Sequence, residues 1–132
     1  MKRHPHATIC IAIGLSCLAA AAAGANRVKA GQWETTLQMF GQTMTKSTCI
    51  TPADAAQING DVRSMTAYVE RVSAPSGCKI QDLRISGDQV SVTSVCGGGK
   101  PHVGTTTYHG DHYETVNTNG AKARAKWVGP CR

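Results

Sequence analysis

The chain has 132 residues, of which 41% are hydrophobic, 5% aromatic and 17% charged, and its formal net charge is +6. This length fits one domain. Nucleic-acid binding needs clustered positive charge, often with stacking aromatics, whereas these charges are spread along the chain, so we expect no nucleic-acid partner.

The first 25 residues have the layout of a secretory signal peptide. A basic start over residues 1–4 precedes an apolar run over residues 7–23, and Ala23-Gly24-Ala25 is a small-x-small cleavage site. A membrane anchor would need roughly 20 consecutive apolar residues without a cleavage pattern. We expect cleavage after Ala25, which leaves a periplasmic domain over residues 26–132 and no transmembrane anchor. Two of the 14 basic residues leave with the leader, so 12 basic residues remain against 8 acidic ones.

Cysteine usage predicts a cross-linked domain. Two of the six cysteines lie in the leader, and the remaining four are Cys49, Cys78, Cys96 and Cys131. An even number of cysteines in an oxidising compartment predicts two disulfides, which would support a small core. A zinc site is the competing use of four cysteines, but no pair has the close spacing of a zinc finger or ribbon.

The first predicted hairpin joins residues 32–40 to residues 43–50 through a glycine-first turn at Gly41-Gln42. This register pairs Trp33 with Ile50 and Met39 with Met44, and it places Leu37 on the same side. One face of the hairpin is therefore expected to be apolar.

A short helix is expected next, from Pro52 to about Ile58. Thr51 can cap it, proline suits the first helical position, and Asn59-Gly60 ends it. The following stretch, residues 61–77, fits either a helix or an irregular strand.

The rest of the chain reads as strands over residues 79–86, 89–96, 103–109, 112–118 and 121–128, separated by glycine-containing turns. Two-residue turns at Gly87-Asp88, Gly110-Asp111 and Asn119-Gly120 set the expected registers. They place Leu83, Ile85, Val90 and Val92 on one face. Further along, they predict a core face of Val116, Ala123, Ala125 and Trp127 and a solvated face of Tyr108, Tyr113, Arg124 and Lys126.

The expected fold is thus mainly β or α+β: a curved antiparallel meander of about seven strands with one short helix. The alternation of side chains between the two faces also predicts the disulfide pairs, because Cys96 and Cys131 both fall on the core face. The favoured pairs are therefore Cys96–Cys131 and Cys49–Cys78, although a single β-bulge would reverse this choice.

Several strings resemble domain-of-unknown-function family 3617, a family of small exported proteobacterial envelope proteins. They occur in the family's order: Gly31-Gln32-Trp33-Glu34, Cys49-Ile50-Thr51-Pro52-Ala53-Asp54, Gly110-Asp111-His112-Tyr113 and Trp127-Val128-Gly129-Pro130-Cys131. The resemblance implies a secreted or periplasmic β-rich domain with paired cysteines. It implies no reaction and brings no catalytic residues.

One group of side chains could bind a metal. A two-residue turn at Gly110-Asp111 would oppose His109 and His112 across two strands, with Glu114 on the same face. Two imidazoles and a carboxylate suit zinc or copper. The competing interpretation is a polar hairpin tip in solvent.

A second group could face a lipidic ligand. Trp33, Leu37, Met39 and Met44 would line a cavity if the sheet curves, and otherwise they form the core under the short helix. No catalytic residues or cofactor are expected. The chain is predicted to be a non-enzymatic binding or structural module for a small or lipidic envelope ligand or an envelope protein, with metal binding through His109 and His112 as the alternative.

Overall fold

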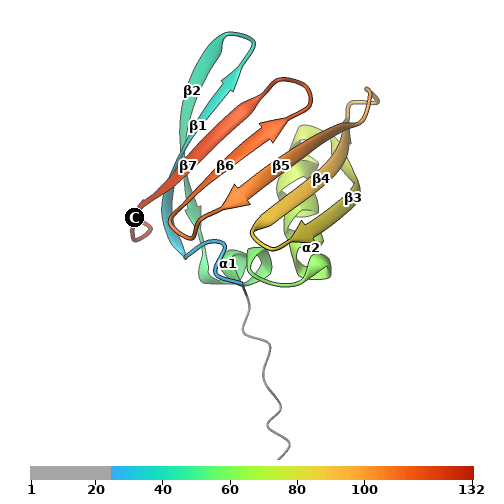
Figure 1. Ribbon diagram of the computed structural model, residues 1–132. Coiled ribbons are helices and arrows are strands. Elements are labelled where there is room, and N and C mark those ends of the chain that lie inside the picture. Colours follow the sequence, from blue (N-terminus) through green and yellow to red (C-terminus); the bar gives the residue numbers. More distant parts are fainter. Residues whose placement is uncertain (1–24) are drawn as a thin grey trace, which may run out of the picture.

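The computed structural model describes residues 25–132, so the predicted leader lies outside the described residues except for Ala25. Seven antiparallel strands form one open sheet in the order β2-β1-β7-β6-β5-β4-β3 (Figure 1). The strands are β1 (Gly31–Met39), β2 (Gln42–Ile50), β3 (Cys78–Ser86), β4 (Gln89–Cys96), β5 (His102–Tyr108), β6 (His112–Asn117) and β7 (Lys122–Gly129). The predicted antiparallel sheet of about seven strands is confirmed. Only β3 to β7 follow one another as a meander, because the β1–β2 hairpin pairs with β7 instead of β3.

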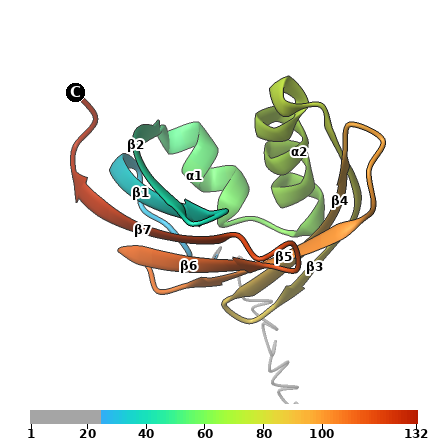
Figure 2. The ribbon, with the colours of Figure 1, turned by 90° about the horizontal axis from the view of Figure 1, so that it is seen from above.

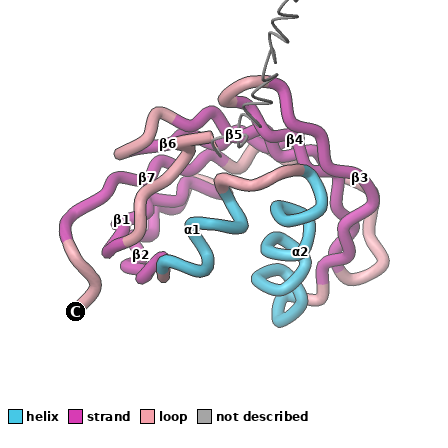
Figure 3. The backbone as a smooth tube through the Cα atoms, turned by 90° about the horizontal axis from the view of Figure 1, so that it is seen from below, coloured by secondary structure: helices cyan, strands magenta, loops and turns pink. Residues whose placement is uncertain are grey.

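Two helices, rather than the one expected, cover the hollow face of the curved sheet (Figures 2 and 3). The first, α1 (Pro52–Ile58), is the predicted short helix, and α2 (Val62–Ser73) occupies the stretch that the sequence left open. A 3₁₀ turn, η1 (Ala74–Ser76), leads from α2 into β3. No helix in residues 25–132 is long and apolar enough to cross a membrane.

Both helices begin at capping side chains. The Thr51 hydroxyl accepts a hydrogen bond from the Asp54 amide at 3.1 Å, and the Asp61 carboxylate accepts one from the Ser64 amide at 2.9 Å. Each cap satisfies a backbone N–H that has no partner within its helix. Arg71 of α2 then donates to Asp54 of α1 at 2.6 Å, so the two helices are also tied to each other.

The core lies between these helices and the sheet. Trp33 and Met65 have the largest fully buried side chains, each 1% exposed. Around them lie the other buried apolar side chains, Val28, Ile50, Ala55, Ile58, Leu83, Val90 and Ala125. The core therefore joins the N-terminal segment, both helices and five of the strands.

The segment before β1 is fixed to the end of α1. Arg27 is buried, and its guanidinium donates to the carbonyls of Ile58 and Gly60 at 2.8 and 2.9 Å. A cation at the C-terminal end of a helix is favoured by the helix dipole. The side chain of Asn59 completes the junction, because it accepts from the Val28 amide and donates to the Val28 carbonyl.

The turn of the first hairpin lies one residue earlier than predicted. Phe40 and Gly41 both have positive φ, 52° and 73°, so they are the two central residues of the turn, and Met39 pairs with Gln42. Leu37 then faces Met44, and Trp33 faces Thr48. The shift changes each pair by two residues, which leaves the same side chains on each face.

The predicted disulfide pairs are wrong. The bonds are Cys49–Cys131 and Cys78–Cys96, and the second joins directly paired residues of β3 and β4. A register shift between Ile80 and Asp82 brings Cys78 opposite Cys96. The alternation of side chains along a regular strand could not reveal this irregularity. One extra residue in a strand moves every later side chain to the opposite face of the sheet.

The predicted faces of β6 are wrong for the same kind of reason. Asn117 pairs with Ala121 across a three-residue loop, not the expected two-residue one, and Gly120 in that loop has φ of 91°. Tyr113 therefore lies opposite Ala125 on the core face, while Val116 is 54% exposed on the outer face. A slip of one residue exchanged the two faces.

Candidate functional site

A cleft of about 210 Å³ opens on the helix-covered face, between α2 and the middle strands of the sheet. Met65 and Val69 of α2 form one wall. Strands β4, β5 and β6 form the other, with Val90, Val92, Ser94, Gly104, Thr106, Tyr108, Thr115 and Asn117. The cleft is smaller than the roughly 300–1,000 Å³ pockets of drug-sized ligands, so it suits a small molecule or one end of a chain.

The cleft combines an apolar wall with a polar floor. Val90 is 2% exposed and Met65 is 1% exposed, and the partly buried Val69 and Val92 pack against the same core. On the floor, the hydroxyl groups of Thr106 and Thr115 lie 2.8 Å apart and share a hydrogen bond. Such a site can bury apolar surface of a ligand and orient its polar end.

Gly104 keeps the floor of the cleft open. A Cβ placed there would lie 3.5 Å from the Asn117 amide nitrogen, which is ordinary van der Waals contact. Its φ also lies outside the positive range that would exclude other residues. A larger side chain at position 104 would therefore fit the strand and take up volume in the cleft.

One row of paired residues runs across the whole sheet on this face. In strand order it consists of Met44, Leu37, Ala123, Thr115, Thr106, Val90 and Ile85. The predicted ligand-facing residues Leu37 and Met44 thus share a face with the cleft, but they lie at the other end of the row. Met39 also lies on this face, close to the hairpin turn.

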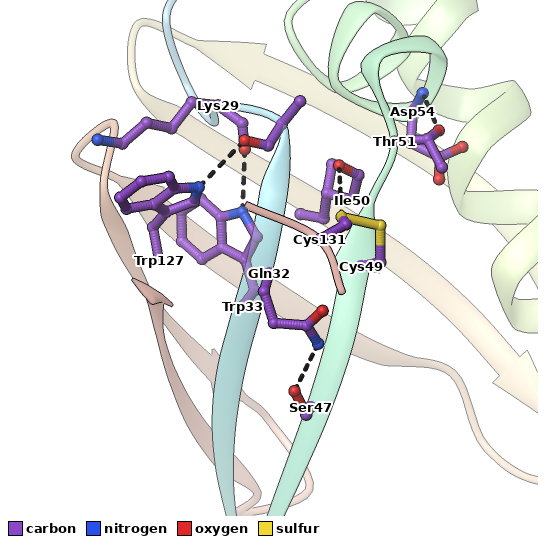
Figure 4. Close-up of a disulfide and its surroundings, with 11 residues drawn as sticks. Lys29, Gln32, Trp33, Ser47, Cys49, Ile50, Thr51, Asp54, Trp127 and Cys131 are labelled. Atoms are coloured by element: carbon purple, nitrogen blue, oxygen red, sulfur yellow. Dashed lines mark hydrogen bonds between the residues drawn. A yellow bond between two sulfur atoms is a disulfide. The ribbon is translucent and has the colours of Figure 1, made fainter. Parts of the chain in front are cut away.

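Trp33, the fourth of those predicted residues, belongs to the core. Its indole N–H donates to the Lys29 carbonyl at 2.9 Å, and the Trp127 indole donates to the neighbouring Ala30 carbonyl at 3.0 Å (Figure 4). The Lys29 ammonium lies 4.2 Å from the centre of the Trp127 ring. Both rings thus fix the chain that enters β1.

Three of the sequence motifs that carry the family resemblance meet at this corner. Gly31 has φ of 142°, and a Cβ there would collide with the Trp127 indole nitrogen. Cys131 closes the same corner through its disulfide to Cys49, next to the buried Ile50 (Figure 4). These strings have a structural role, because they hold the two ends of the domain together.

Three tyrosines form a cluster beside the cleft. The ring centres of Tyr108 and Tyr113 lie 5.5 Å apart, and the two residues pair across β5 and β6. They face the core, however, not Arg124 and Lys126. Burial raises the pKa of Tyr108 and Tyr113, and also that of Tyr68 on α2, because the charged phenolate is poorly solvated there.

His109 and His112 oppose each other as predicted, with ring centres 4.4 Å apart and nearly parallel planes. The imidazole of His112 also contacts the Asp111 carboxylate at 2.6 Å, and this hydrogen bond lowers the pKa of Asp111. Glu114 instead lies 3.8 Å from Arg124. Across residues 25–132, no group of three His, Cys, Asp or Glu side chains is arranged to hold a metal ion.

The outer face carries two hollows of about 400 and 340 Å³ along β1, β6 and β7. Charged side chains of opposite sign meet in them, with Lys126 at 3.4 Å from Glu34 and Arg124 near Glu114. These exposed pairs satisfy one another and are screened by solvent. The cleft under α2 is the better candidate, because its valine and methionine side chains offer apolar surface beside hydroxyl groups.

Sequence reasoning missed the α2 side of the cleft. Met65 and Val69 are four residues apart, which puts them on one face of a helix. Asp61 is a preferred N-cap residue and marks where this helix begins, since its carboxylate accepts from the backbone amide of Ser64. Those two signals together could have identified α2, although not the strands it covers.

The disulfides are typical of proteins that fold in an oxidising compartment outside the cytoplasm. No curated protein and no solved structure matches the chain. The model of the family described as "Protein of unknown function (DUF3617)" matches residues 28–131, so the chain belongs to the family that its strings resemble.

Proposed function

We propose that the chain is a non-enzymatic binding module of the periplasm, whose cleft takes a small, mainly apolar ligand with one polar end. The observation that carries this proposal is the cleft itself, in which valine and methionine side chains lie beside a pair of hydrogen-bonded threonines between α2 and β4–β6. The leader pattern and the disulfides support the periplasmic location.

A medium-chain fatty acid is a suitable probe, because its alkyl chain matches the apolar wall and its carboxylate can accept hydrogen bonds from hydroxyl groups. Calorimetric titration with decanoate tests the proposal directly. Wild-type protein is expected to bind it, and Gly104→Val to bind it about tenfold more weakly or not at all, because the new side chain occupies the cleft.

Thr107→Val is the matched control for this titration. Thr107 lies on the same strand but on the outer face, where it pairs with Gln89 and Glu114. The control is expected to bind decanoate like the wild type. Equal binding by Gly104→Val, or no binding by the wild type, would contradict a ligand site in the cleft and favour a role in contacting another envelope protein.

A further inference from the structure

We propose that the turn of the β1–β2 hairpin is a docking tip for an anionic lipid bilayer. The tip consists of four apolar residues, Leu37, Met39, Phe40 and Met44. Phe40 is 87% exposed and Met44 is 55% exposed, while Leu37 and Met39 are half-buried. In Figure 1 this turn lies at the upper end of the sheet, away from both helices.

The backbone at Phe40 has an unfavourable conformation for a bulky residue, with φ of 52°. Phe40 is the only non-glycine residue with positive φ among residues 25–132. A turn with two positive φ values favours Asn-Gly, and a bulky side chain is strained there. An exposed aromatic side chain held in a strained conformation contributes nothing to the core, which points to a role in contact with something outside the protein.

The charges around the tip identify the surface that it fits. Lys46 lies two residues from Met44 on the same face of β2, and Lys122 pairs with Gln38 on the other face beside the turn. Neither lysine takes part in the ion pairs found within the described residues. The tip is therefore an apolar apex between two free ammonium groups.

The same end of the molecule contains few carboxylates. No Asp or Glu occurs in residues 35–53, 89–110 or 115–132, which supply the β1–β2, β4–β5 and β6–β7 connections at this end. Lys100 lies in the β4–β5 connection. Cations at this end would approach anionic headgroups without repulsion from acidic side chains, while the apolar apex enters the boundary with the acyl chains.

A bilayer fits this tip better than a protein partner does. A stable protein interface buries about 800 Å² on each partner, over well-packed complementary surfaces. A single turn with one aromatic and two exposed or half-exposed methionine side chains is too small for that. A bilayer requires no complementary shape, only apolar side chains with cations at the level of the headgroups.

Co-sedimentation with vesicles tests the proposal. The exported protein is mixed with vesicles of phosphatidylcholine alone or with one quarter phosphatidylglycerol, at about 0.1 M salt. It is expected to sediment with the anionic vesicles and much less with the neutral ones. Phe40→Ser should weaken binding about tenfold or more, and Lys122→Gln about fivefold.

Two controls make the outcome decisive. Val128→Ser removes a 46% exposed valine at the far end of β7 and should bind like the wild type. Gly104→Val, which blocks the cleft, should also bind like the wild type, so failure of the cleft proposal leaves this one intact.

Three results would overturn the proposal. The wild type could fail to sediment with anionic vesicles, or Phe40→Ser could sediment as the wild type does. The third is self-association that depends on Phe40 in the absence of lipid, together with no binding to vesicles, which would make the tip a contact between copies of the chain.

Discussion

The ring of Tyr113 packs against that of Trp33, with the ring centres 5.5 Å apart and the planes inclined by 32°. Tyr113 in turn contacts Tyr108, so an aromatic row crosses the core face from β1 through β6 to β5. This row forms the part of the sheet that adjoins the cleft. The faces of β6 are therefore central to both the fold and the proposed ligand site.

Truncation of Tyr113 tests which face of β6 is buried. Tyr113→Ala should lower the free energy of unfolding by about 2 kcal/mol or more, because the partly buried ring of Tyr113 packs against the core. Val116→Ala, on the exposed face of the same strand, should change it by less than about 0.5 kcal/mol. Urea denaturation of both variants measures the difference. A larger loss of stability in Val116→Ala than in Tyr113→Ala would show that Val116, not Tyr113, lies on the buried face of β6.

The tyrosines also predict how the protein responds to alkali. Burial raises the pKa of Tyr68, Tyr108 and Tyr113 above the ordinary value of 10.0. The folded state therefore holds these protons more tightly than the unfolded state. The stability they contribute is fully present below pH 10 and is lost as the pH rises above it. Absorbance of tyrosinate should rise together with the loss of circular dichroism, not before it.

Removing each disulfide should have a different cost. Cys49–Cys131 joins residues 82 apart in sequence, whereas Cys78–Cys96 joins residues 18 apart. In the chain-entropy model these loops correspond to about 4.5 and about 3 kcal/mol of stability. The double variant Cys49→Ser/Cys131→Ser should therefore have the lower melting temperature. Peptide mapping without reduction should recover these two pairs, and recovery of a Cys96–Cys131 peptide would contradict the fold.

Phe40 is expected to be unfavourable for stability. Asparagine tolerates positive φ far better than phenylalanine does, so Phe40→Asn should raise the free energy of unfolding by about 1 kcal/mol. The melting temperature should increase while binding to anionic vesicles decreases. A fall in the melting temperature would show that Phe40 supports the fold, and it would remove one argument for the docking tip.

Much of the fold was predictable because its signals are local. Thr51 and Pro52 marked the start of α1, and the apolar alternation across Gly87-Asp88 gave the correct pairing of Leu83 with Val92. The turn at Gly110-Asp111 likewise placed His109 opposite His112. In each case a short segment contains all the information that sets its structure.

The errors came from irregularities that a regular pattern cannot reveal. A three-residue loop before Ala121 exchanged the faces of β6, and a register shift beside Gln81 changed the disulfide partner of Cys78. The cleft depends on where α2 crosses the sheet. That position follows from the packing of Met65 against distant strands, which no local segment encodes.

Amide chemical-shift mapping during a decanoate titration is the most direct test of the proposed ligand site between α2 and the sheet. Saturable shifts are expected at Met65, Val92, Gly104 and Thr106, with little change at Phe40 and at the His109–His112 turn. Shifts that concentrate at Phe40, or that rise without saturation across the whole surface, would contradict a ligand site between α2 and the sheet.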